Sequence, residues 1–152
     1  MFTGFLHLHN LLRWVVLALC VACVARATVV DSKGKNFEPR DRKLLLGLTI
    51  ACDTQLLLGL TMYFLFSPMA KTAFAAWSLA MKDRVVRYWA IEHGVGMLLA
   101  IALVHVANVR AKRAGDNPRA RQSVRRMLVA ALLLFLLTQP WPFLPYGRSL
   151  IP

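Results

Sequence analysis

The sequence predicts an all-α protein, a four-helix transmembrane bundle made by one domain over residues 1–152. The first observation behind this prediction is composition: 58% of the 152 residues are hydrophobic, and the mean hydropathy is +0.53. A water-soluble domain of this length has too little interior to bury so many apolar side chains. The second observation is that the apolar residues gather in four long stretches separated by short basic segments. The lipid bilayer is therefore the expected surrounding of the helices.

The four apolar stretches are expected at about residues 3–28, 42–66, 85–110 and 121–139. A helix rises ~1.5 Å per residue, so about 20 residues cross a hydrocarbon core of about 30 Å. Each stretch is about that long or longer. Short connections between them place consecutive helices antiparallel.

The basic residues predict how the bundle is oriented. The net charge is +12, yet no element of a nucleic-acid-reading fold is visible, so nucleic acid is not an expected partner. Thirteen Lys and Arg residues lie between the first and second or the third and fourth stretches: Arg26, Lys33, Lys35, Arg40, Arg42, Lys43, Arg110, Lys112, Arg113, Arg119, Arg121, Arg125 and Arg126. Five lie on the opposite side: Lys71, Lys82, Arg84, Arg87 and Arg148. Because basic loops stay in the cytoplasm, both termini are predicted outside.

Two further segments are expected at the outer surface of the membrane. Between the second and third stretches, small and apolar residues recur at helical spacing from Pro68 to Lys82, which predicts a short interfacial helix. The prolines and aromatic residues that follow Gln139 end the fourth helix and favour the headgroup region.

Polar side chains inside the apolar stretches are the candidate functional residues, because a charged group in hydrocarbon is costly unless it is paired or faces the bundle interior. They are His7, His9, Arg13, Asp53, Glu92, His93 and His105, and Asn10 and Gln55 accompany them. Arg13 and Asp53 both lie within about two residues of the expected midplane. An ion pair between the first two helices is therefore expected, with Gln55 and Glu92 completing a buried polar network.

His9 and His93 are the candidate ligands of a cofactor. Both are expected about four to six residues to the outer side of the midplane, in helices that run in the same direction. His9 shares a helix face with Arg13, whereas His7 lies on nearly the opposite side at ~100° per residue. The glycines at 94 and 96 leave space beside His93. That space suits a haem b held by two histidines, or alternatively close packing between helices.

A metal site facing the periplasm is the alternative to a haem if the first residues are extended rather than helical. His7 and His9 would then point the same way and could join Glu92 and His93 around a copper or zinc ion. No motif for hydrolysis or group transfer is present, so an electron-transfer or accessory subunit is favoured over a self-contained enzyme. A structural subunit without any cofactor is the remaining alternative.

Several strings together resemble a family of short bacterial four-helix membrane proteins labelled cytochrome b-like. They are residues 4–10 (GFLHLHN) with Leu12-Arg13-Trp14, residues 55–60 (QLLLGL) with Tyr63-Phe64, Glu92-His93 with residues 97–100, and the closing residues 140–143 (PWPF). The resemblance covers all four stretches in order. It implies an electron-transfer subunit of the bacterial cytoplasmic (inner) membrane that carries a haem or metal, exchanges electrons with a quinone or a membrane-complex partner, and uses His7 or His9 with His93.

The chain departs from the family's pattern in the second helix. A histidine is expected there shortly before the glutamine, and Asp53 stands in that place. This departure argues against any site that needs a third histidine, and it makes the expected pair of Arg13 and Asp53 a local substitute for the missing histidine.

Overall fold

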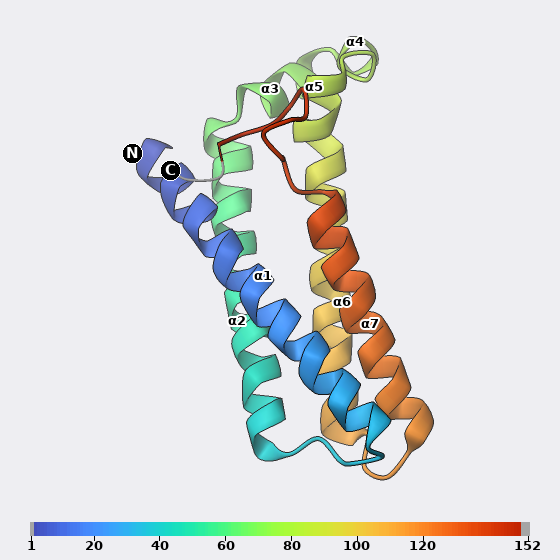
Figure 1. Ribbon diagram of the computed structural model, residues 1–152. Coiled ribbons are helices and arrows are strands. Elements are labelled where there is room, and N and C mark those ends of the chain that lie inside the picture. The colour runs from blue at the N-terminus through green and yellow to red at the C-terminus, as the bar shows by residue number, and fades with distance from the viewer. Residues whose placement is uncertain (1, 150–152) are drawn as a thin grey trace.

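Four long helices make up the body of the protein (Figure 1). The computed structural model describes residues 2–149, and every regular element in that range is helical. The long helices are α1 (Phe2–Ser32), α2 (Pro39–Thr61), α6 (His93–Arg113) and α7 (Pro118–Leu137). Between α2 and α6 lie the short elements η1 (Met62–Phe66), α3 (Pro68–Ala75), α4 (Trp77–Ala80), α5 (Arg84–Arg87) and η2 (Tyr88–Glu92).

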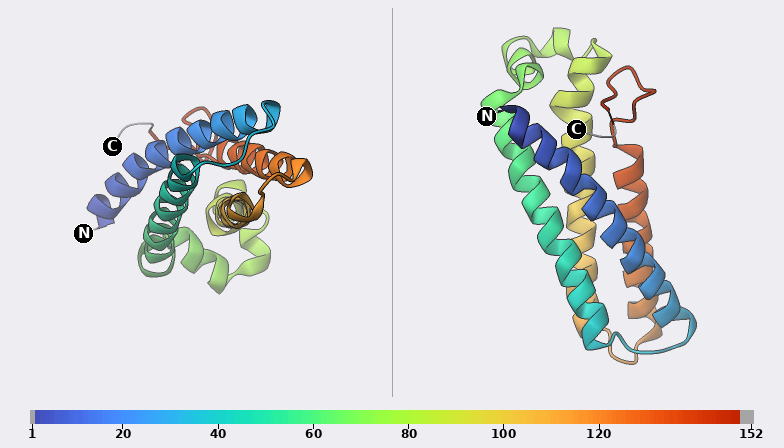
Figure 2. Two further views of the ribbon diagram at one scale, coloured as in Figure 1. Left: turned by 90° about the horizontal axis from the view of Figure 1, so that it is seen from below. Right: turned by 60° about the vertical axis from the view of Figure 1, so that its left-hand side comes forward.

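The long helices run alternately up and down around a common core. α1 packs against α2 and α7, and α6 packs against the same two helices from the other side (Figure 2). The α1–α2 and α6–α7 connections, residues 33–38 and 114–117, form what we call the basic end. The opposite cap end carries α3 to α5 and the C-terminal segment, residues 139–149 (Figure 1).

Local sequence explains where the helices begin. Pro39 and Pro118 stand in the first turns of α2 and α7, where proline's missing N–H costs nothing. Before α2, the side chain of Glu38 and that of Asp41 form a reciprocal capping box. Before α7, the side chain of Asn117 accepts hydrogen bonds from the first backbone N–H groups. These caps satisfy donors that would otherwise lack partners at the helix ends.

Three helical stretches are long and apolar enough to cross a membrane: Thr3–Ser32, Pro39–Phe66 and Arg84–Arg113. They match the first three stretches that hydropathy predicts. α7 does not meet the same description, because four arginines lie within its first nine residues. Its uninterrupted apolar part begins only at Met127 and is about 16 Å long at ~1.5 Å per residue.

The single interfacial helix expected from Pro68 to Lys82 is instead two short helices, α3 and α4. The break falls at Ala76, whose φ of −145° and ψ of 68° are not helical. The regular recurrence of small residues predicted a continuous element, but it contains no signal for this break.

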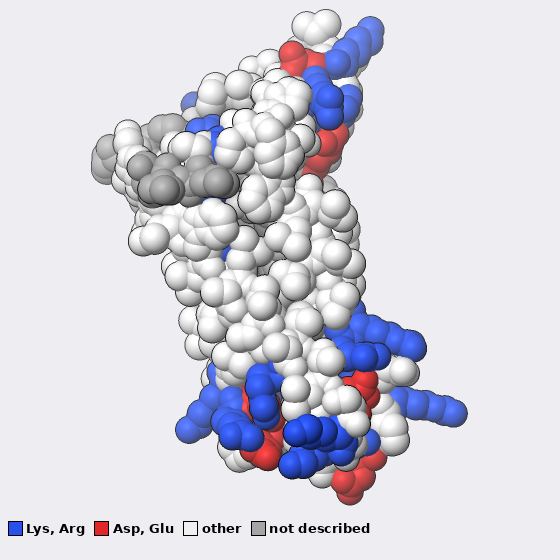
Figure 3. Space-filling view, viewed as in Figure 1, with Lys and Arg blue, Asp and Glu red and all other residues white. Residues whose placement is uncertain are grey.

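Charge and apolar surface separate along the bundle axis. On the face shown in Figure 3, Lys and Arg side chains gather mainly at the basic end, with a smaller group at the cap end and an apolar band between them. At the basic end, Arg26 contacts Asp41 at 2.8 Å and Arg125 contacts Asp31 at 3.0 Å, which ties α1 to α2 and to α7. The core lies between these charged ends and includes Cys20, Leu48, Val104 and Leu128, each 0% exposed.

Candidate functional site

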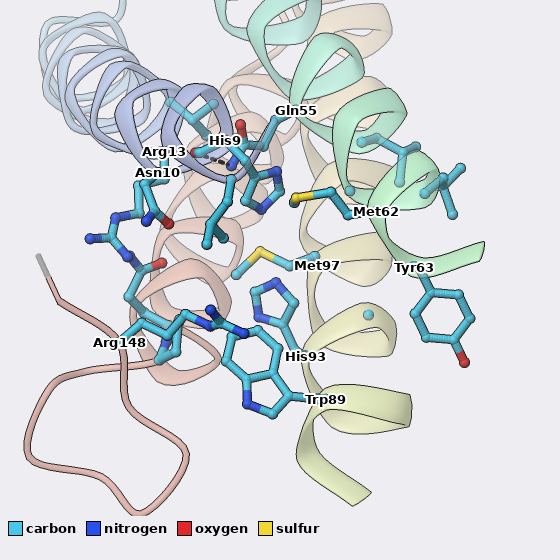
Figure 4. A pocket seen from close by; sticks show the side chains of 18 of the residues that line it. His9, Asn10, Arg13, Gln55, Met62, Tyr63, Trp89, His93, Met97 and Arg148 are labelled. Carbon is cyan, nitrogen blue, oxygen red and sulfur yellow. Dashed lines mark hydrogen bonds between the residues drawn. The ribbon is translucent and has the colours of Figure 1, made fainter. Parts of the chain in front are cut away.

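A cavity of about 250 Å³ lies in the cap half of the bundle. Its walls come from α1, the second half of α2 with η1 and the start of α3, η2 with the first turns of α6, the end of α7, and the beginning and end of the C-terminal segment (Figure 4). Most of the wall is apolar, and the polar side chains are few. Cavities with an apolar wall and a small number of placed polar groups are typical of ligand sites.

His9 reaches this cavity from α1. Asn10, Arg13 and Val16 of the same helix also line it, as expected for residues about one turn apart. The backbone carbonyl of His9 accepts a hydrogen bond from Nε2 of Gln55, at 3.0 Å, which ties α1 to α2 beside the site. Nδ1 of His9 is buried and has no hydrogen-bond partner among the described residues.

His93 enters the same cavity from the first turn of α6. Its Nδ1–H donates to the carbonyl of Thr138, at 2.9 Å, a bond that fixes the ring and leaves Nε2 without that proton. The hydroxyl of Tyr88 donates to the same carbonyl at 2.6 Å. The end of α7 therefore holds the imidazole of His93 in one orientation.

The two π-helical turns of the structure lie at this cavity. η1 begins with Met62 and Tyr63, which line the wall, and η2 contributes Trp89, four residues before His93. A π-helical turn shifts the side chains that follow it relative to an ordinary helix, and such turns are frequent at functional sites. Here one such turn stands at each end of the α2–α6 connection, beside the cavity.

Two methionines stand between the two histidines. Figure 4 shows the thioethers of Met62 and Met97 directed into the space between the rings of His9 and His93. Met97 follows His93 by one helical turn, so both side chains leave the same face of α6. Gly59 lies opposite His9, where an added Cβ would come within 3.3 Å of Cε1 of the ring.

The polar rim of the cavity is positive. Nη2 of Arg13 donates to the carbonyl of Ser149 at 3.0 Å. With the amide of Gln139 assigned so that its oxygen faces Arg13, that oxygen accepts from Nε and Nη1 of Arg13 at 3.2 and 3.3 Å. Arg148 also reaches the cavity, with its guanidinium carbon 4.7 Å from the centre of the Trp89 ring. No Asp or Glu is among the described residues of the wall.

The expected partnership of Arg13 with Asp53 is wrong. Asp53 accepts a hydrogen bond from Nε2 of His105, at 2.8 Å, on the side of α2 that faces α6. Position explains the difference, because Asp53 follows Cys52, which lines the cavity, and is turned ~100° from it around the helix. Residue number predicts the height of Arg13 and Asp53 along the bundle axis. It does not predict the direction in which each side chain points around its helix.

Two other candidate residues lie outside the cavity. α1 is already helical at His7, whose side chain is exposed. Glu92 is also exposed and pairs with Nε of Arg87 at 2.6 Å. The arrangement in which His7, His9, Glu92 and His93 surround one ion is therefore absent, and no group of three or more His, Cys, Asp or Glu residues suited to a metal occurs within residues 2–149.

The structure adds residues that sequence reasoning did not select. Tyr88 and Thr138 reach the site from η2 and the end of α7, whereas Gln139 and Arg148 reach it through the C-terminal segment. Met62 carries no sequence signal of its own. Met97 stands four residues after His93, and that spacing could have identified it.

No model of a known protein family matches the chain, and no characterised protein or solved structure is detectably similar to it. The resemblance to cytochrome b-like proteins therefore stays a prediction.

Proposed function

We propose that this protein is an electron-transfer subunit of the membrane that binds one haem b through His9 and His93. The observation that carries the proposal is that these two histidines, from α1 and α6, line a single cavity in the cap half of the bundle. Two histidines from different helices are the usual ligands of a b-type haem in a helical bundle.

The donor atoms suit this role. A ligating histidine generally donates its second ring N–H to a carbonyl or carboxylate, and His93 does so to Thr138. On the other wall, Nδ1 of His9 and Oε1 of Gln55 are buried and have no hydrogen-bond partner among the described residues. Buried polar atoms in that condition are uncommon, and a bound group would supply partners for them.

The space suits a macrocycle only after two side chains move. The cavity volume of about 250 Å³ is just below the range of roughly 300–1,000 Å³ found for sites that bury drug-sized ligands. Met62 and Met97 stand between the imidazoles, and methionine is the most adaptable of the large apolar side chains. Their displacement toward the surrounding lipid would enlarge the space without moving a helix.

Within this proposal the chain's own residues hold and insulate the cofactor. The imidazoles would hold the iron, Thr138 and Tyr88 orient His93, and the apolar wall excludes water. A haem iron supplies one-electron chemistry, so a quinone or a membrane-complex partner would be the donor or acceptor.

The proposal includes the complete topology. In this topology α7 would be the fourth crossing helix, and its packing along α1 and α6, both of which are candidate membrane spans, supports this. The basic end would face the cytoplasm and the cap end the outer side, with α3 and α4 at the interface. A bacterial inner membrane fits this arrangement.

A copper(I) ion is the second candidate, and Met62 and Met97 favour it. Thioether and imidazole donors together suit copper(I), whereas zinc prefers four ligands from thiolates, imidazoles and carboxylates. Cys52 also lines the cavity but precedes Met62 by ten residues, ~15 Å along the helix, and so is far from this group.

The test compares the detergent-purified protein with three histidine variants after expression with ample haem precursor and copper. We expect a sharp α-band after reduction, one haem per chain, and loss of the band in His9→Ala and His93→Ala. His7→Ala is the matched control, because His7 is exposed outside the cavity, and it should keep the band.

Met97→Leu separates the two metal candidates. Haem binding should persist in this variant, since leucine occupies a similar volume, whereas a copper site would lose one of its ligands. A folded wild-type protein that binds neither haem nor copper would contradict the proposal and favour a structural subunit without a cofactor.

A further inference from the structure

An open groove lies at the basic end, on the surface of α6 beside the beginning of α7. The two helices pack side by side (Figure 1), and the groove has a volume of about 520 Å³. Five residues of α6 and one of α7 line it: His105, Val106, Val109, Arg110, Arg113 and Ala120. The groove shares no described residue with the cavity that His9 and His93 line, so it is a separate site.

The wall changes from apolar to basic along α6. Val106, Val109, Arg110 and Arg113 recur at the spacing of one helix face, so they form a continuous stripe. Both valines are exposed, at 42% and 46%. The arginines lie in the last turn of α6, at the end of a candidate membrane span. In a bilayer the arginines therefore stand at the level of the head groups, and the valines face the hydrocarbon.

The two arginines have no acidic partner among residues 2–149. Nη1 of Arg110 donates to Oγ of Ser123 on α7 at 2.7 Å, which holds the guanidinium beside α7 and leaves its other donors available. None of the ion pairs between described residues includes Arg110 or Arg113. No Asp or Glu is among the described residues of the groove wall. This end of the groove therefore favours an anionic group.

The opposite end of the groove has the reverse preference. His105 lies there, ~12 Å from Arg113 along the helix, and its Nε2–H donates to Oδ1 of Asp53 at 2.8 Å. The carboxylate of Asp53 repels an acidic group at this end, whereas the arginines attract one at the other. The groove therefore suits an elongated ligand in one direction, with its anionic head at the arginines and its apolar body along the valines.

We propose that this groove binds an anionic phospholipid of the leaflet at the basic end. The phosphate of the lipid lies between Arg110 and Arg113, and one acyl chain lies along Val106 and Val109. Basic pockets between transmembrane helices bind the head groups of acidic lipids, and the planar fork of a guanidinium matches phosphate oxygens. The inference rests on the membrane location of the helices and not on a cofactor in the cavity.

Native mass spectrometry of the protein in a nonionic detergent tests the proposal, because it counts bound lipids during a titration. Phosphatidylglycerol and phosphatidylcholine with identical oleoyl chains are compared, since they differ in net charge but not in their apolar part. We expect wild type to bind one phosphatidylglycerol roughly 10-fold more tightly than phosphatidylcholine. Arg110→Gln and Arg113→Gln should each weaken phosphatidylglycerol binding roughly 10-fold, as for the loss of one hydrogen bond to a charged group.

Lys112→Gln is the matched control for charge. Lys112 lies in the same turn and is exposed, but it points ~200° around the helix from Arg110 and is not part of the described groove wall, so lipid affinity should not change. Val109→Trp keeps both arginines and fills the groove, so it should lose the bound lipid. Soluble glycerol phosphate carries the phosphate without acyl chains, and it should not compete with the lipid.

Three results would overturn the lipid site. They are equal affinity of wild type for the two lipids, equal effects of Arg110→Gln and Lys112→Gln, and retention of the lipid by Val109→Trp. Competition by glycerol phosphate would also overturn it, because the ligand would then be a small phosphate compound. None of these results bears on His9 and His93, whose haem band is measured separately.

Discussion

At the scale of single residues, the carbonyl of Thr138 organises the candidate site. It accepts hydrogen bonds from Tyr88 and His93, so one backbone atom at the end of α7 orients two side chains of the opposite helix. Close approach of α6 and α7 makes this possible. Gly96 provides the approach, because a Cβ at that position would overlap Cγ2 of Thr138.

Gly96→Ala is therefore expected to destabilise the protein. The added methyl group must push Thr138 away from α6, and overpacking of this kind costs roughly 1–3 kcal/mol. Thermal unfolding in detergent measures the change. Gly47→Ala is the control, since no atom outside its own helix lies within 4 Å of the added Cβ, and it should be neutral or stabilising. Equal effects of the two substitutions would contradict the packing argument.

At the scale of elements, polar pairs fix the register of α2 against α6. Nδ2 of Asn108 donates to Oγ1 of Thr49 at 3.1 Å, and His105 bonds Asp53 at 2.8 Å. The two helices are antiparallel. Asp53 therefore follows Thr49 by four residues on α2, while its partner His105 precedes Asn108 by three residues on α6. Between helices in lipid, such side-chain bonds supply specificity that apolar contact alone lacks.

Thr49→Val tests the buried member of these pairs. The substitution keeps the shape of the side chain but leaves the amide of Asn108 without its partner, and interhelical bonds of this type are worth about 0.6–1.7 kcal/mol. We expect a loss of that size in unfolding experiments in detergent. Thr54→Val removes a hydroxyl that bonds only Ile50 in its own helix, and it should change stability less. If both variants behave alike, the α2–α6 bond contributes nothing specific.

At the scale of the whole molecule, the asymmetry of basic charge governs the proposed orientation. The basic end carries most of the Lys and Arg residues, and a helix bundle inserts with its more basic end in the cytoplasm. The same orientation places the cavity, Arg148 and the C-terminal segment near the outer surface, where a ligand could enter without crossing the basic end.

Cysteine labelling of intact cells tests this orientation. Cys20, Cys23 and Cys52 are at most 2% exposed, so wild type should not react with a membrane-impermeant maleimide. Lys82→Cys, at the cap end, should react in intact cells. Lys35→Cys, at the basic end, should react only after the membrane is opened. Labelling in the reverse order would contradict the proposed topology.

The sequence by itself determined the helical architecture and the approximate heights of its polar groups. Hydropathy and length predict three of the long helices closely, because apolar stretches that must satisfy their backbone hydrogen bonds in lipid have few alternatives to a helix. Height follows from residue number alone, so it was possible to predict that His9 and His93 lie at the same level.

Tertiary structure alone decided which polar groups meet. Direction around each helix depends on how the helices pack, and this is why Asp53 joins His105 instead of Arg13. The π-helical turns η1 and η2 shift the side chains near the cavity in a way that no periodicity reveals. The fold-back of the C-terminal segment brings Arg148 to Trp89 across a large separation in sequence, and such contacts arise from packing rather than from local pattern.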